Sequence, residues 1–228
     1  MKKLVFALAC VAVTTAHAKQ TWQTIQNDLK IDLQVEEVAT PREALESIDR
    51  MEMHFKKRDV GDTLVIIEQI INLGEKLWNI IESNQAVSEV EHKYANALPA
   101  GVRGPEELDE FSPMQHKSYR MHGKNWFGST VYDVTYTLVH RYGGRYQSKG
   151  QYLDGVTVLP NHVSTLWGYK LNMGVEGVST VNVGTREKPI GSIMMQMTFK
   201  VGTVLKKTEY RGLYEFRGDS RTVTALEQ

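Results

Sequence analysis

Alternation of apolar and polar residues dominates the second half of the chain and constrains the fold most strongly. A period of two places alternate side chains on opposite faces of a β-strand, so one face can be buried while the other meets water. The clearest such faces are Tyr132, Val134, Tyr136, Leu138 and His140 in one segment and Ile193, Met195, Met197, Phe199 and Val201 in another. Between segments, Gly143–Gly144 predicts a hairpin turn.

Short turns without intervening helices join these segments, which is typical of antiparallel sheets stacked face to face. Residues 29–36 also alternate, as Leu29, Ile31, Leu33 and Val35, and predict an additional strand. We therefore expect an α+β fold: an antiparallel β-sandwich of six to eight strands, its β-rich part spanning 86–228, with an N-terminal helical hairpin packed on it.

The hairpin is expected over residues 40–84. Thr40-Pro41-Arg42-Glu43 has the form of a capping box with proline at the first helical position, which predicts a helix start. Gly61 and Asp62 predict a break and a new start. Over 63–83 the isoleucines fall on one helical arc and the polar residues on the other. The second helix should therefore cover one face of the sheet.

The N-terminal residues have the three parts of a secretory signal peptide. Lys2 and Lys3 precede an apolar stretch, and Ala16-His17-Ala18 matches an Ala-x-Ala cleavage signal. We expect a signal peptide over 1–18, cleaved after Ala18, and a single mature domain over 19–228 in the periplasm or outside the cell. The mature chain would contain no cysteine, because Cys10 is the only one.

Charge and motifs exclude several classes of function. Removing Lys2 and Lys3 from the 27 basic residues leaves 25 against 27 acidic ones, a net charge of −2. A near-neutral chain has no general attraction for nucleic acid. No nucleophile elbow, Ser-x-x-Lys or His-Glu-x-x-His motif is present. His116 and His122 are too far apart on one strand to share an ion. We expect no catalytic residue, metal or cofactor.

The favoured function is that of an exported, bacterial-type binding or interaction protein. Loops at the ends of a sandwich, here 98–113 and 184–189, can vary on a rigid scaffold. Aromatic side chains outside a core can stack on a ligand. The candidate ligand-binding residues, for an unidentified protein or glycan, are Trp126, Trp167, Tyr169, Arg186 and Lys188.

Two alternatives stay open. A membrane-associated or pore-forming protein could use the apolar arc of the helix predicted at 63–83. The acidic polar arc, with Glu68, Glu75 and Glu82 against Lys76, makes this contact less favoured. A hydrolase without a recognisable motif is the second alternative, since converging carboxylates can come from distant strands.

Overall fold

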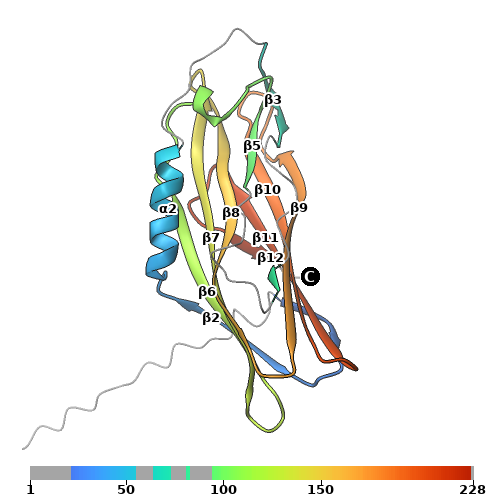
Figure 1. Ribbon diagram of the computed structural model, residues 1–228. Helices are drawn as coiled ribbons and strands as arrows, with labels where there is room; N and C mark the ends of the chain where they lie inside the picture. The colour runs from blue at the N-terminus through green and yellow to red at the C-terminus, as the bar shows by residue number, and fades with distance from the viewer. Residues whose placement is uncertain (1–21, 55–63, 73–80, 83–93, 227–228) are drawn as a thin grey trace, which may run out of the picture.

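The alternating segments form two antiparallel sheets packed face to face (Figure 1). The computed structural model describes residues 22–54, 64–72, 81–82 and 94–226. The expected signal peptide, residues 1–18, lies outside these. The first sheet has the order β1-β11-β10-β9-β4, and β12 also pairs with β11. Its strands are β1 (Trp22–Asn27), β4 (Ile81–Glu82), β9 (Lys170–Asn182), β10 (Gly191–Gly202), β11 (Lys207–Arg217) and β12 (Thr224–Leu226).

The second sheet has the order β2-β6-β7-β8-β5-β3. Its strands are β2 (Asp32–Val38), β3 (Ile66–Ile71), β5 (Ala95–Ala100), β6 (Gln115–Lys124), β7 (Thr130–Tyr146) and β8 (Lys149–Thr165). The described residues thus form twelve strands, more than the six to eight expected. Two short strands explain part of the difference, because β4 and β12 have only 2 and 3 residues and give no periodic signal. The strand β3 lies where the sequence predicts a helix, and part of β5 lies where it predicts a loop.

The predicted faces meet in the core between the sheets. Alternate residues of β7 and β10 are buried in one cluster as the period of two requires. The rings of Tyr132 and Phe199 lie 4.7 Å apart across the sheets. The hydroxyl groups of Tyr136 and Tyr214, also from opposite sheets, lie 2.9 Å apart. Burial raises the pKa of both phenols, so they stay neutral and hydrogen-bonded to each other.

The expected first helix is present as α2 (Arg42–His54) and packs on the outer face of the second sheet (Figure 1). Ile48 is buried against Val139 of β7 and Leu159 of β8. The carboxylate of Glu52 accepts a hydrogen bond of 2.6 Å from the backbone N–H of Met114. Burying one stripe of a helix on a sheet is the ordinary way to stabilise it.

The prediction of a second helix over 63–83 is wrong for the residues of this segment that the structure describes. Ile66–Ile71 is an edge strand, β3, which pairs antiparallel with β5, and Ile81–Glu82 is β4. Residues 73–80 lie outside the described residues. A run of isoleucines satisfies a helical arc and a strand equally well, but β-branched side chains favour a pleated surface. Pairing with the buried strand β5 favours the strand.

The turn predicted at Gly143–Gly144 is also displaced. Both glycines lie inside β7, and the hairpin turns at Gln147 and Ser148, whose φ angles are 49° and 61°. Two successive left-handed residues are the signature of a type I′ turn. Gly144 lies against the ring of Phe111, so that a side chain there would clash. Close packing therefore explains this glycine.

A buried ion pair links β7 and β8. Arg141 and Asp154 are opposite each other in register, and the Arg141 guanidinium donates through Nε at 3.1 Å and through a terminal nitrogen to Asp154 Oδ2. Asp154 is fully buried, and burial raises its pKa more than Arg141 lowers it. Removing the guanidinium would leave an uncompensated carboxylate in the interior.

We expect Arg141→Met to lower the free energy of unfolding by about 3–5 kcal/mol, since one member of a buried pair is left unpaired. Chemical denaturation followed by circular dichroism measures this. The control Arg42→Met removes the exposed Arg42–Glu46 pair of α2 and should cost at most about 0.5 kcal/mol. Equal losses in both variants would contradict the assignment of Arg141 and Asp154 as a stabilising buried pair.

The buried His140 makes stability depend on pH. Desolvation lowers its pKa to about 4, while the backbone oxygen of Ser220, 3.4 Å from Nε2, opposes the shift. The unfolded chain then binds more protons than the folded one between about pH 6.5 and pH 4. Stability should therefore fall by about 3 kcal/mol as the pH drops through this window. Denaturation of His140→Gln should lack this component; identical pH profiles for both chains would contradict it.

Candidate functional site

Four turns lie together at one end of the sandwich, the lower end in Figure 1. They are residues 28–31, 125–129, 166–169 and 203–206. Strand pairing links each to the next. Lys124 is opposite Asp32, and Lys170 is opposite Gly202. The N–H of Leu166 donates to the carbonyl of Val131 at 2.8 Å. We call this region the turn end.

The turn between β6 and β7 is built by its polar residue and its glycine. The side-chain oxygen of Asn125 accepts hydrogen bonds from the N–H groups of Phe127 at 3.1 Å and Ser129 at 3.0 Å. Gly128 adopts φ = 81°, which favours glycine. The side chains of Trp126 and Phe127 therefore make none of the hydrogen bonds that form the turn. Their rings, 4.2 Å apart, project together.

In the turns 166–169 and 203–206 as well, some residues form the turn and others point their side chains into solvent. Gly168, with φ = 85°, closes the turn in which the N–H of Tyr169 donates to the carbonyl of Leu166 at 3.1 Å. Thr203 Oγ1 accepts from the N–H groups of Leu205 at 3.4 Å and Lys206 at 3.2 Å. Turn positions of this kind usually hold polar residues or glycine. Here several hold large apolar side chains instead.

Five apolar side chains are consequently presented to solvent at the turn end. Their exposed fractions are 80% for Trp126, 75% for Phe127, 95% for Trp167, 100% for Val204 and 91% for Leu205. We call these five residues the apolar tips. Single exposed apolar residues are common, but a group of them on neighbouring turns is a candidate interaction surface.

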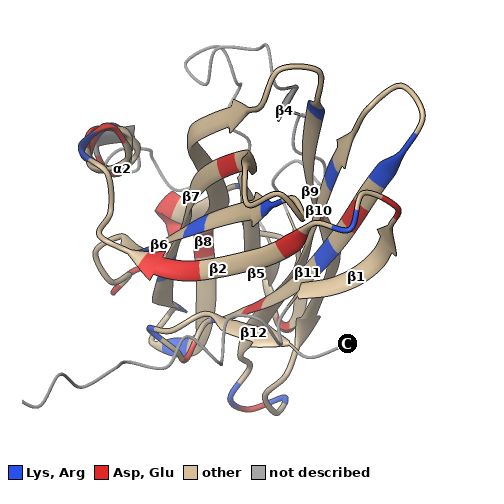
Figure 2. Cartoon of the chain, turned by 90° about the horizontal axis from the view of Figure 1, so that it is seen from below, with Lys and Arg blue, Asp and Glu red and all other residues tan. Residues whose placement is uncertain are grey.

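Exposed lysines surround the apolar tips. Figure 2, which views the molecule from this end, shows blue segments beside the projecting turns. The lysines of the turns and of the strand residues next to them are Lys30, Lys124, Lys170, Lys206 and Lys207, and we call them the lysine collar. Among the described residues, no carboxylate forms an ion pair with any of the five. Asp28 and Asp32 are the nearby acids in the sequence of the first turn.

The structure separates the predicted binding residues into two groups. Trp126, Trp167 and Tyr169 lie at the turn end, with Tyr169 half-buried against the core. Arg186 and Lys188 lie in the loop after β9. That strand has 13 residues and spans about 40 Å at 3.3 Å per residue, so the loop is at the opposite end. Phe127, Val204 and Leu205 are not among the binding residues predicted from the sequence, although their position beside the turn-forming residues Asn125 and Thr203 is a signal.

The loop with Arg186 and Lys188 is held by Asn182. Its side-chain oxygen accepts from the N–H groups of Gly184 at 2.9 Å and Ile190 at 3.0 Å. Both basic side chains are exposed. The loop following β5, which contains a short 3-10 helix, η2 (Pro105–Glu107), also lies away from the turn end. Both loops therefore lie away from Trp126 and Trp167, and Arg186 and Lys188 cannot share a binding site with these tryptophans.

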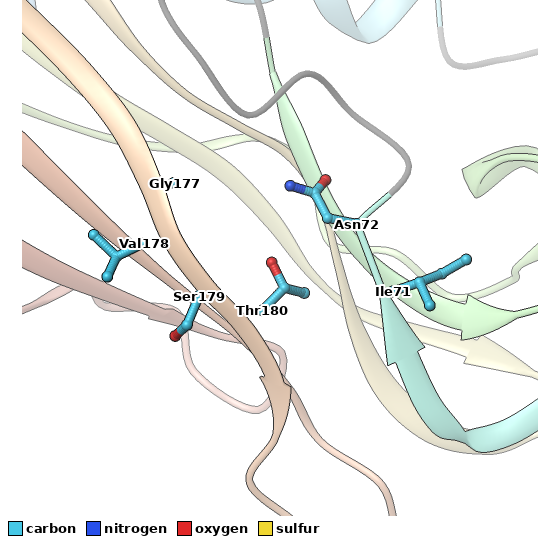
Figure 3. A pocket seen from close by; sticks show the side chains of 6 residues that line it. All are labelled: Ile71, Asn72, Gly177, Val178, Ser179 and Thr180. Carbon is cyan, nitrogen blue, oxygen red and sulfur yellow. The ribbon is translucent and has the colours of Figure 1, made fainter.

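A pocket of about 330 Å³ lies between β9 and the end of β3, the edge strand of the second sheet (Figure 3). It is lined by Ile71, Asn72, Gly177, Val178, Ser179 and Thr180. These six residues supply an amide, two hydroxyls and apolar surface but no titratable side chain. The pocket therefore offers no general acid or base of its own for hydrolysis.

The histidines considered as ligands make hydrogen bonds instead. His116 Nδ1 lies 3.0 Å from the hydroxyl of Thr40, and His122 Nε2 lies 2.8 Å from the side-chain oxygen of Gln34. Across the described ranges, no three His, Cys, Asp or Glu side chains gather as metal ligands do.

Comparisons with protein-family models, with curated proteins and with solved structures find no match for this chain. Within the described part of the chain, no helix has the length and apolar character needed to cross a membrane.

Because the apolar tips contact mainly solvent, replacing them should leave stability unchanged. We expect Trp167→Ala and Leu205→Ala each to change the free energy of unfolding by less than about 0.5 kcal/mol. Gly168→Ala, in the same turn as Trp167, should cost about 1 kcal/mol or more because its φ is positive. Denaturant titrations compare the three variants. A large loss on Trp167→Ala would show that the tip belongs to the core.

Proposed function

We propose that this chain is an exported binding protein whose turn end docks on the surface of a lipid bilayer. The observation that carries the proposal is the set of five exposed apolar tips on three neighbouring turns at one end of the sandwich. Secretion is supported by the signal-like residues 1–18, with Ala16 and Ala18 at the expected cleavage site.

The chemistry of the tips fits the boundary between headgroups and acyl chains. Tryptophan is enriched there because its ring is apolar while its N–H can still meet water or headgroups. An inserted element at this boundary reaches about 5–10 Å deep. Val204 and Leu205 would supply purely apolar contacts beside the rings of Trp126, Phe127 and Trp167.

The energetics favour reversible docking. Fully burying a large apolar side chain contributes about 1.5–3 kcal/mol, so five fully buried tips would supply at most about 15 kcal/mol. Association costs several kcal/mol in lost freedom of motion. The difference corresponds to a peripheral protein that binds and leaves, without a span across the bilayer.

A protein or glycan ligand fits the tips less well. Sites for small ligands such as glycans are usually concave and surround their ligand with side chains. A protein interface packs its apolar core inside a polar rim that hydrogen-bonds to the partner. The apolar tips project from three separate turns and are 75–100% exposed, so the chain does not enclose them as a concave site encloses its ligand. The membrane alternative predicted from the sequence used a helix at 63–83, but Ile66–Ile71 is a strand. The present proposal therefore rests on different residues.

Co-flotation with phospholipid vesicles tests the proposal. The mature chain should float with the vesicles, and Trp126→Ala/Trp167→Ala should float at least tenfold less, because two buried rings are lost. Leu205→Ser should also weaken binding. Its control is Leu64→Ser, a leucine 84% exposed that lies before β3, beside Gly101 and away from the turn end.

The emission of Trp126 and Trp167 should shift to shorter wavelength when vesicles are added, as the rings leave water. A chain that stays at the bottom of the gradient with every vesicle composition would refute bilayer docking. Equal losses for Leu205→Ser and Leu64→Ser would refute the placement at the turn end. Retention on a glycan or protein surface without any flotation would assign the tips to another ligand class.

A further inference from the structure

We propose that the lysine collar makes the turn end selective for anionic phospholipid. This inference rests on the proposed function, because it concerns the headgroups around the inserted tips. The observation is that every one of the four turns carries an exposed lysine in it or beside it. Lys124 precedes Trp126 by two residues, Lys170 follows Trp167 by three, and Lys206 is next to Leu205.

The charge of the turn end differs from that of the chain as a whole. Without Lys2 and Lys3 the chain has 25 basic and 27 acidic residues, and so has a net charge of −2. The turn end holds the five collar lysines against Asp28 and Asp32, a local excess of three positive charges. A general attraction for anions is therefore absent, while a local one coincides with the apolar tips.

Geometry lets both kinds of side chain act at once. A lysine stem can lie along apolar surface while its ammonium group reaches the polar layer. With the tips among the acyl chains, the collar lysines in and beside the turns would reach the phosphates. Since no described carboxylate pairs with these lysines, their ammonium groups need not break an ion pair to bind a phosphate.

The occupant is an anionic bilayer because a free anion explains only half of the surface. Soluble phosphate could meet the lysines, but it would leave the apolar tips in water. A neutral bilayer would bury the tips and leave the collar without partners. Each lysine close to an anionic membrane strengthens binding about fivefold, and salt screens this contribution.

The test compares vesicles of phosphatidylcholine alone with vesicles containing about 30% phosphatidylglycerol, a composition that gives a negative surface. The full mature chain should bind the anionic vesicles at least about 25-fold more tightly, the contribution of two collar lysines alone. Lys124→Gln/Lys170→Gln should lose about 25-fold on anionic vesicles and little on neutral ones. The matched control is Lys149→Gln/Lys188→Gln, two exposed lysines at the opposite end, which should change neither.

The outcomes separate the inference from the function on which it rests. Equal binding to both vesicle types would overturn the anionic selectivity and leave bilayer docking intact. Binding to neither would overturn docking itself. Equal losses in the two double variants would overturn the role of the collar and indicate net charge. Release of the chain from anionic vesicles by excess soluble glycerol phosphate, at constant ionic strength, would overturn the bilayer as the source of the phosphate.

Discussion

The rest of this structure depends on one constraint: the apolar faces of the two sheets, formed by alternate residues of their strands, must be buried against each other. Each sheet has a face that is stable only when the other covers it. Tyr132 packs on Phe199, and Tyr136 is hydrogen-bonded to Tyr214, so each pair joins the two sheets. The second contact shows how the core accommodates polar groups, because the hydroxyls of Tyr136 and Tyr214 each have the other, from the opposite sheet, as hydrogen-bond partner. Because Cys10 is the only cysteine of the sequence, this packing must hold the fold without an internal disulfide.

The sequence predicts those elements whose signal is local and repeated. Strands with several alternating positions are found, as is the helix that begins after Thr40-Pro41. The strand Ile66–Ile71 is missed because its partner, β5, contains Pro99 and three alanines and does not resemble a strand. A pairing between segments about thirty residues apart leaves no local pattern. The displaced turn at Gln147–Ser148 is similar, since Phe111 explains Gly144 and lies far from it in sequence.

Only part of the candidate site is predicted from the sequence, and the direction of successive strands explains why. Successive antiparallel strands alternate direction, so turns separated by an even number of strands lie at the same end. The turns with Trp126, Trp167 and Leu205 are separated by two strands each, whereas the loop with Arg186 follows Trp167 by one. Counting strands would therefore have separated Arg186 and Lys188 from the tryptophans. Val204 and Leu205 are not predicted as binding residues, because apolar residues that follow a strand resemble a continuation of its buried face.

Preorganisation connects the scaffold to the proposed contact. Asn125, Gly168 and Thr203 fix three turns by hydrogen bonds or backbone conformation, and strand pairing fixes the turns relative to one another. The apolar tips are thus held in position before any partner arrives, and less freedom of motion is lost on docking. The lysines differ, because their long stems are free to adapt to headgroups that diffuse. A rigid apolar set inside a flexible basic collar suits a surface that is soft and chemically uniform. It suits a single shaped ligand less well, since such a ligand would need fixed polar groups around the tips.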